Sequence, residues 1–336
     1  MAMSLHASAL KAAFEAADAP SPDDAEDYAI ARAAGCGYLA LALSGAPTFL
    51  IPLAATPGFG VGRSGGGFSL RPASRVTFRY DARQWDQAAA ALECTDAALM
   101  DTFCVLVLDL IKRLDASPLE VTWSRILAWL DEWQSLLGRR GGLSTEQQLG
   151  LWGELWLVSR AAHPDRLVEA WRGPERDAVD FFLDGIGLEV KVSRNAHVHH
   201  VSQRQVDLPV GQHGAYLLSL WVAPEPVRGI SLAQLVDSLS ATVSDPARFL
   251  RHVALLGYSL MDREQYSLRY VALDDPLWFP AADVPRVRAA DPGIAQIRYV
   301  VTLNPDKCVG KEMERDLWRH FCQVESPALI TPTSHS

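Results

Sequence analysis

The residues with the clearest capacity for chemistry lie close together, between Asp180 and Lys191. This segment reads DFFLDGIGLEVK, in which Asp-Gly is a turn dipeptide and apolar residues then alternate with Glu189 and Lys191. The pattern predicts a β-hairpin. Because side chains alternate along a strand, Glu189 and Lys191 share a face, and the antiparallel partner can bring Asp180 beside them. The spacing therefore predicts that two carboxylates and one ammonium group converge.

Charged side chains are unfavourable inside a strand unless something uses them. Asp and Glu oxygens are hard ligands of the kind that Mg²⁺ or Mn²⁺ prefers, so a cation held by Asp180 and Glu189 would neutralise the cluster. Lys191 could then orient a water molecule or stabilise the negative charge that develops during attack on a phosphate. A structural salt bridge between Lys191 and Glu189 or Asp180 explains the spacing equally well.

The order of these residues along the chain resembles the PD-(D/E)XK nuclease superfamily. More closely, it resembles a group of PD-(D/E)XK-motif proteins associated with bacterial phage-defence gene clusters. The landmarks are LGLWGEL at 149–155, WRGP at 171–174, DF at 180–181, EVK at 189–191 and HVSQRQ at 200–205. Val179 stands where the textual motif has proline. The resemblance covers residues 145–222 and implies an α/β, restriction-endonuclease-like core, in which helices flank a mixed sheet.

The resemblance also implies a role for each candidate residue. Asp180 and Glu189 would bind the metal, with Glu154 as a third ligand, while Lys191 and Gln205 would assist catalysis. Two plainer interpretations stay open: Glu154 as a helix-surface residue near the positive end of the helix dipole, and Gln205 as an ordinary helix-start residue.

The stretch after Lys191 is the most cation-capable part of the chain near this site, and it is expected to be a loop. Cationic, hydroxyl and amide groups bind nucleic-acid backbones, so this loop is predicted to contact the substrate. The candidates are Arg194, His200, Ser202 and Arg204. Its His-x-His-His cluster could instead bind zinc, although no cysteine lies nearby. Trp171 could stack on a base, but packing is the expected role.

With 336 residues, the chain exceeds the usual size of one domain. We predict an α+β N-terminal domain over 1–142, a docking or recognition module, then a nuclease-like domain over 143–325 and a disordered tail over 326–336. Expected helices cover 1–20, 21–35, 97–114, 122–137, 145–161 and 311–324, with further starts at Ser231 and Asp245. Expected strands cover 38–43, 48–53, 68–80, 216–222, 266–273 and 295–303.

Composition limits the possible functions. The net charge of −9 argues against a protein that coats nucleic acid, so any DNA binding must be local, metal-assisted or shared with a partner. Five scattered cysteines are typical of reduced cytoplasmic thiols. No apolar run reaches transmembrane length. Residues 60–65 satisfy G-x-G-x-x-G, but a strand rather than a helix is expected to follow, so no dinucleotide cofactor is predicted.

Together these observations predict a metal-dependent phosphodiesterase of the cytoplasm, specifically a Mg²⁺-dependent DNA endonuclease of a bacterial defence or restriction-like system. DNA is favoured over RNA as the substrate. Protein partners from a defence operon are expected, a homo-oligomer is compatible with the sequence, and membrane association is not expected. The alternative is a catalytically silent scaffold that uses a nuclease fold to bind nucleic acid or a partner subunit.

Overall fold

The computed structural model describes residues 6–17, 28–55, 62–65, 67–80, 83–116, 119–137, 142–175, 179–202, 214–260, 263–287 and 297–325. The chain divides into two units, each with its own sheet and helices. Unit 1 comprises Met1–Arg140 with Ser259–Met261, and unit 2 comprises Gly141–Tyr258 with Asp262–Ser336. The functional roles expected for the two domains stay predictions.

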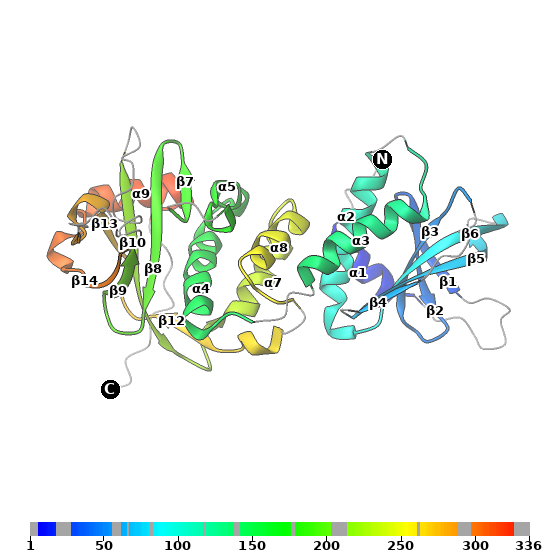
Figure 1. Ribbon diagram of the computed structural model, residues 1–336, viewed down its shortest axis with the longest axis horizontal. Coiled ribbons are helices and arrows are strands. Elements are labelled where there is room, and N and C mark those ends of the chain that lie inside the picture. The colour runs from blue at the N-terminus through cyan, green and yellow to red at the C-terminus, as the bar shows by residue number, and fades with distance from the viewer. Residues whose placement is uncertain are drawn as a thin grey trace. The chain divides into compact units, whose positions relative to one another are not determined.

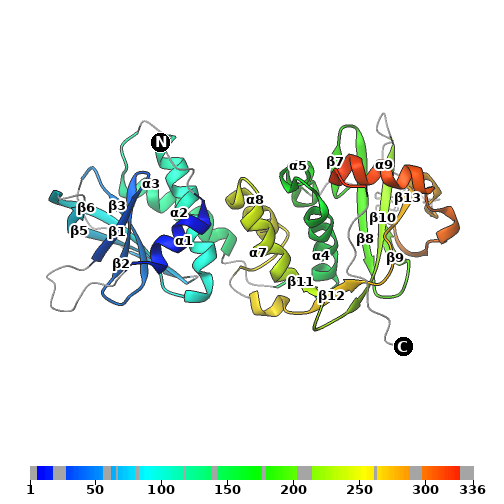
Figure 2. The same ribbon diagram turned by 180° about the vertical axis from the view of Figure 1, so that it is seen from behind.

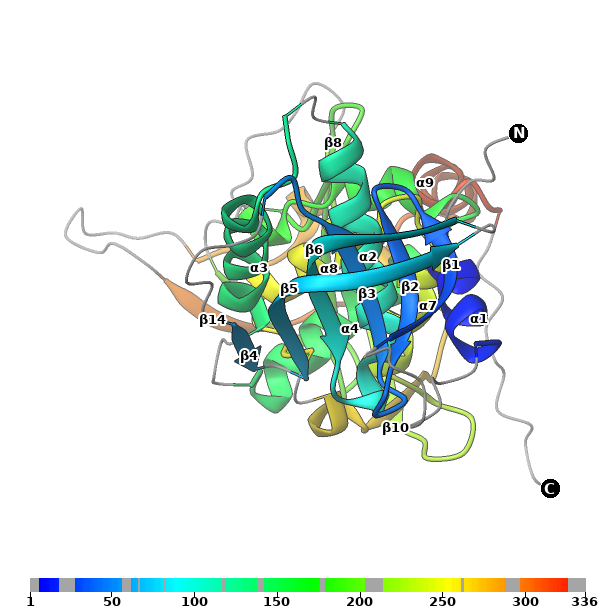
Figure 3. The same cartoon turned by 90° about the vertical axis from the view of Figure 1, so that its right-hand side faces the viewer.

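Unit 1 is built on an antiparallel sheet with the strand order β1-β2-β3-β6-β5-β4. Its strands are β1 (Tyr28–Ala34), β2 (Gly37–Ala42), β3 (Pro47–Pro52), β4 (Arg63–Gly65), β5 (Phe68–Tyr80) and β6 (Arg83–Cys94). Its helices are α1 (Ala7–Glu15), η1 (Ala97–Leu99), α2 (Met100–Asp115) and α3 (Trp123–Leu137). The helices gather on one side of the sheet (Figure 1), and α2 lies behind the strands when the sheet faces the viewer (Figure 3).

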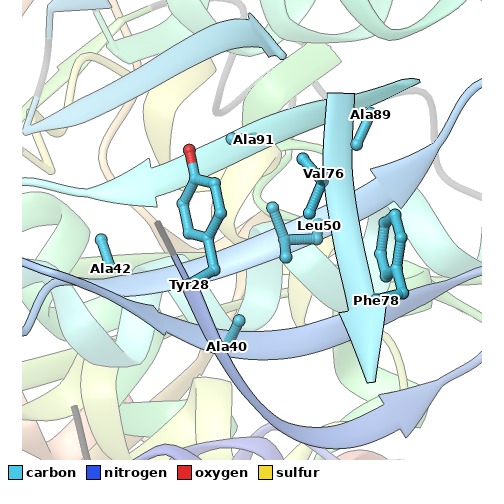
Figure 4. Close-up of a cluster of buried hydrophobic side chains, with 8 residues drawn as sticks. All are labelled: Tyr28, Ala40, Ala42, Leu50, Val76, Phe78, Ala89 and Ala91. Carbon is cyan, nitrogen blue, oxygen red and sulfur yellow. The ribbon is translucent and has the colours of Figure 1, made fainter. Parts of the chain in front are cut away.

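The two faces of this sheet are buried in different ways. On the helix side, Phe68 of β5 packs against Phe103 of α2, with 6.0 Å between ring centroids. Strand alternation sends Ala89 and Ala91 of β6 to the opposite face, where they join a second apolar cluster (Figure 4). The sheet curls so that β1 contacts β5, although the two strands are not neighbours in the strand order. The strands themselves therefore cover this apolar cluster.

Unit 2 contains a mixed sheet with the order β11-β12-β10-β8-β7, and β13 also pairs with β10. Its strands are β7 (Phe181–Leu183), β8 (Ile186–Ser193), β10 (Ala215–Pro224), β11 (Ile230–Ser231), β12 (Arg269–Ala272) and β13 (Leu277–Pro280). Strands β9 (Val198–Ser202) and β14 (Arg298–Thr302) form a separate ribbon. The helices are α4 (Thr145–Arg160), α5 (Pro164–Ala170), α7 (Leu232–Thr242), α8 (Pro246–Leu255) and α9 (Lys311–Cys322), with short 3-10 turns η2 (Gly173–Glu175), η3 (Arg263–Tyr266), η4 (Ala281–Asp283) and η5 (Pro305–Lys307).

The pairing of β8 with β10 is parallel, whereas β7 and β12 are antiparallel to their neighbours. Helix α4 lies between this sheet and α7, and both opposite views show the same order of layers (Figures 1 and 2). A mixed, curled sheet flanked by helices is the restriction-endonuclease-like α/β core that the sequence predicts. Within the described residues, every helix is too short or too polar to cross a membrane.

Local sequence signals explain where the helices of unit 2 begin. The Ser144 hydroxyl accepts from the Gln147 backbone N–H at 3.2 Å, and the Gln147 side chain accepts from the Ser144 N–H at 2.9 Å. Ser231 and Gln234 repeat this reciprocal cap at the start of α7, and the Asp245 side chain caps α8. All three predicted helix starts are confirmed.

Two predicted elements are wrong. The helix expected over 21–35 is replaced, from Tyr28 onward, by β1, because Tyr28 and Ile30 pair with β2 and bury their side chains in the curled face. The loop expected after Lys191 contains β9, which pairs with β14 from a distant part of the sequence. Strands β4, β6, β11 and β13 and helix α5 were not anticipated. Residues 21–27, the helix expected at Gln205 and the tail at 326–336 lie outside the described residues.

Helix α4 approaches β8 at Gly153. A Cβ atom built on Gly153 would lie 2.1 Å from Cγ2 of Val192 and 3.4 Å from Cγ1 of Val190. Real side chains do not tolerate the shorter distance, so helix and sheet can meet here only with glycine at this position. Gly150, one turn earlier on the same helix, has open space around the same virtual atom.

This difference gives a matched pair of substitutions. We expect Gly153→Ala to lower the free energy of unfolding by about 1–3 kcal/mol, because the added methyl group overpacks the helix–sheet contact. Gly150→Ala should instead raise it by about 0.5–1 kcal/mol, because alanine restricts the unfolded chain without a clash. Chemical denaturation of both variants checks the pair, and equal effects would contradict the packing argument.

Candidate active site

Four charged side chains from three segments form the candidate active site. Asp180 directly precedes β7, Glu189 and Lys191 lie on β8, and Glu154 lies on α4. The predicted hairpin is confirmed: β7 pairs antiparallel with β8, and both turn residues, Asp184 and Gly185, have positive φ. Because Phe181 pairs with Leu188, the register brings Asp180 opposite Glu189.

Lys191 and Glu189 point the same way and touch. The Lys191 Nζ lies 2.8 Å from Oε1 of Glu189. Glu189 is only 2% exposed, whereas 19% of the Lys191 side chain is exposed. Asp180 is anchored by the backbone, since its Oδ2 accepts from the Val190 N–H at 2.7 Å. The hairpin therefore holds two carboxylates and the ammonium group at one edge of the sheet.

Glu154 reaches the cluster from the helix. Its Oε2 accepts from the indole N–H of Trp171 at 2.6 Å. Gly173 makes this contact possible, because a Cβ there would lie only 2.8 Å from the same oxygen. Trp171 is 1% exposed and stacks on Phe181, so it packs and positions Glu154, and it is not placed to stack on a base.

The pKa values of the cluster reflect burial and mutual repulsion. Burial, followed by the charges of Glu189 and Glu154, raises the pKa of Asp180 well above its ordinary value. Burial also raises the pKa of Glu189, against the opposing effect of Lys191. The pKa of Glu154 rises to about 7, mainly through burial, although the Trp171 hydrogen bond opposes the rise. Burial lowers the pKa of Lys191, but the facing carboxylates outweigh this effect and raise it overall.

Comparison with known families places this arrangement in context. A family model described as "Putative PD-(D/E)XK family member, (DUF4420)" matches residues 67–304, which is more than half of the chain. The chain belongs to the DUF4420 family. The predicted PD-(D/E)XK resemblance is thus confirmed, while the family description carries no reference to phage defence. No curated protein and no solved structure matches the chain.

The DUF4420 match includes all four cluster residues, but other candidates are placed differently. Arg194 and His200 are exposed and Ser202 is half-buried. No described hydrogen bond or ion pair joins these three to the cluster, so their contact with a substrate stays a prediction. Arg204 and Gln205 lie outside the described residues.

The histidine-rich stretch does not form one cluster, because β9 sends its side chains to opposite faces. His199 is 2% exposed, whereas His200 is exposed. His197 Nδ1 and His199 Nε2 each lie 2.7 Å from the hydroxyl oxygen of Ser219, the register partner of Lys191 on β10. Burial, and then the charge of Lys191, lowers the pKa of His199 to about 3, so this imidazole is neutral at physiological pH.

This Ser219 network was not anticipated from the sequence. Ser219 lies within an apolar strand and differs from its neighbours only in polarity, which was the one available signal. Its partners are His197, which directly precedes β9, and His199 on β9, whose strand character depends on pairing with the remote β14. The network lies next to Lys191, on the neighbouring strand β10. It adds hydrogen-bonding groups beside the cluster but no further negative charge.

The donor set of the cluster fits a hard divalent cation. Asp180, Glu189 and Glu154 supply carboxylate oxygens, and their raised pKa values show that added positive charge would stabilise the ionised forms. In the described part of the chain, no three His, Cys, Asp or Glu side chains are already spaced to hold a metal. Mg²⁺ needs only one or two carboxylates, with water and substrate phosphate completing its shell.

Glu154 gives this site a testable pH signature. Its folded-state pKa near 7 exceeds the ordinary 4.5, so the folded protein binds this proton more tightly than the unfolded chain does. The stabilisation is complete below the ordinary value and is lost as pH rises towards 7. In metal-free protein, Glu154→Gln should therefore raise the free energy of unfolding at pH 8 by about 1–3 kcal/mol and flatten the decline.

Urea denaturation across this pH range checks the Glu154 prediction. Glu169→Gln is the matched control, because Glu169 is an exposed carboxylate on the adjacent helix α5. Its curve should follow that of the wild type. A Glu154→Gln curve that also follows the wild type would show that Glu154 is not a buried, ionisable member of the cluster.

Proposed function

We propose that this chain is a metal-dependent phosphodiesterase, specifically a DNA endonuclease that uses Mg²⁺ or Mn²⁺. The observation that carries this proposal is the gathering of Asp180, Glu154, Glu189 and Lys191 in one buried cluster, in which each charge shifts the pKa of its neighbours. The stability of the fold does not explain why three carboxylates surround one ammonium group, because apolar residues of similar volume would pack there without a desolvation penalty. Membership of a PD-(D/E)XK family supports the same conclusion.

The proposed roles follow from the positions of the side chains. Asp180 and Glu189 would hold the cation, with Glu154 as a third ligand or an orienting group. When bound, the cation would supply Lewis-acid activation of phosphate and water. Lys191 would stabilise the negative charge that develops on phosphorus, because its ammonium group is held beside Glu189 and remains partly open to solvent. Gln205 would assist, and Arg194, His200, Ser202 and Arg204 would bind the strand backbone.

The biological setting is proposed on the family resemblance and the charge. We propose a cytoplasmic enzyme of a bacterial defence or restriction-like system that cleaves DNA rather than RNA. A net charge of −9 provides little long-range attraction to nucleic acid, so partner proteins from a defence operon, or a second copy of the chain, would help to hold the substrate. Unit 1 would act as a recognition or docking module.

A catalytically silent scaffold is the second candidate. One observation favours it: each carboxylate already has a protein donor, namely Lys191 for Glu189, Trp171 for Glu154 and the Val190 N–H for Asp180. In this alternative, the cluster is a structural charge network, and the fold binds nucleic acid or a partner subunit without cleaving anything. Metal affinity separates the two candidates, because a scaffold does not require a cation here.

Titration calorimetry with Mg²⁺ and with Mn²⁺ tests the proposal without any knowledge of the substrate. The wild type should bind, whereas Asp180→Asn and Glu189→Gln should lose binding while circular dichroism confirms their folding. Asp184→Asn is the matched control, because Asp184 lies in the same hairpin but pairs with Arg166 at 2.6 Å and is 65% exposed. It should bind as the wild type does.

Lys191→Met separates metal binding from catalysis. This variant should keep or strengthen metal binding, since Lys191 no longer competes for Glu189 Oε1, but should lose cleavage in a screen of DNA and RNA substrates. Absence of metal binding in the folded wild type would favour the scaffold. Loss of binding in Asp184→Asn as well would remove the site from the position proposed.

A further inference from the structure

One face of the unit 1 sheet is covered by none of the described helices and carries several small side chains. Ala40, Ala42, Ala89 and Ala91 lie on this face, and the ring of Tyr28 stands beside them (Figure 4). Each of these alanines is no more than 5% exposed, so the curled sheet itself shields them from water. They pack with Leu50, Val76 and Phe78 in one apolar cluster.

A cavity of about 500 Å³ lies beside this cluster, at one end of the curled sheet, where β1 begins and β2 and β6 end. The described residues that line it are Tyr28, Ala42, Leu43, Ser44, Arg71 and Glu93. Pockets for small ligands span about 300–1,000 Å³. The cavity is therefore large enough for a small molecule or for one monomer of a polymer.

A charged pair forms the polar wall of this cavity. Glu93 is only 9% exposed, and its Oε2 lies 2.7 Å from Nη2 of Arg71. Ser44 and Ser69 also donate to the Glu93 carboxylate, at 3.5 and 3.4 Å. The Arg71 side chain is 56% exposed, so its guanidinium lies at the opening. A glutamate this deeply buried is unfavourable unless hydrogen-bonding partners compensate it, as Arg71, Ser44 and Ser69 do here.

The combination of these groups determines which ligand fits. The Arg71–Glu93 pair is neutral as a whole, which favours an uncharged polar ligand over a bare phosphate. Arg and Glu recognise the edges of bases, Arg as a planar donor and Glu as an acceptor for an exocyclic amino group. Tyr28 also lines the cavity, but at 8% exposure most of its side chain packs into the apolar cluster, so Arg71 and Glu93 provide the recognition.

We propose that this pocket of unit 1 binds a nucleobase, presented by a nucleic-acid strand or by a free nucleotide. The inference rests on the proposed function, because it gives unit 1 a means of recognising the substrate of the unit 2 site. A base must leave the stack to enter such a cavity, which is easiest in single strands and at mispaired positions. Unit 1 would thus select unstacked or extruded bases.

The test uses the full chain with Asp180→Asn, in EDTA, so that neither cleavage nor metal binding contributes. Calorimetry would measure binding of the four deoxynucleoside 5′-monophosphates, a single-stranded oligonucleotide and deoxyribose 5-phosphate. At least one nucleotide should bind, and the sugar phosphate without a base should not. Tighter binding of the oligonucleotide would identify a base within a strand as the ligand, whereas equal binding would identify a free nucleotide.

Three substitutions locate the binding. Arg71→Ala should weaken binding by about tenfold, the value of one planar donor pair. Leu43→Trp should block the cavity, and it is expected to fold because Leu43 is 50% exposed. Arg75→Ala is the matched control, because Arg75 lies on the same strand, is 77% exposed and pairs with Asp86 away from the cavity. It should bind as the parent does.

Failure of all nucleotides to bind would overturn the inference, as would equal binding of the sugar phosphate or unchanged binding in folded Arg71→Ala and Leu43→Trp. These results are distinguishable from failure of the proposed function. Nucleotide binding in unit 1 without any metal affinity in the wild type would leave this inference standing and remove the nuclease proposal. Metal-dependent cleavage without nucleotide binding would do the reverse.

Discussion

The close contact between α4 and β8 at Gly153 determines where the charged cluster can form. With no side chain at this position, the helix backbone lies directly against Val192. The next residue, Glu154, then lies close enough to Glu189 and Lys191 for their charges to act on its pKa. Gly173 plays a similar part, since only the absence of a Cβ atom lets Trp171 bond to Glu154. Two glycines thus control how closely the charged residues approach.

Electrostatics then sets what the cluster can do. Three carboxylates share one ammonium group in a region largely withdrawn from water, and each carboxylate keeps a raised pKa despite its protein donor. The hydrogen bonds from Lys191, Trp171 and the Val190 N–H reduce the cost of burying the carboxylates, but they do not neutralise the charge of the cluster. A residual negative potential of this kind is what the proposed divalent cation would neutralise.

Much of the fold follows from local signals. The three helix caps of unit 2 and the turn of the β7–β8 hairpin are readable from neighbouring residues, because their hydrogen bonds close within a few positions. Strands β2, β3 and β5 of unit 1 were also predicted. The predictions failed where strand pairing and packing override the local preference, through the neighbouring β2 for β1 and the remote β14 for β9. Alanine-rich 28–34 favours a helix locally but becomes β1, and the polar stretch after Lys191 becomes β9.

The sequence alone determined the chemistry of the site: alternation along β8 places Glu189 and Lys191 on one face, and the turn at Asp184 returns the chain past Asp180. Only the tertiary structure decided which other groups join them. Trp171 on Glu154, and Ser219 with its two histidines behind Lys191, depend on contacts between segments far apart in sequence. Short-range periodicity carries no information about such contacts, because they depend on how whole elements pack.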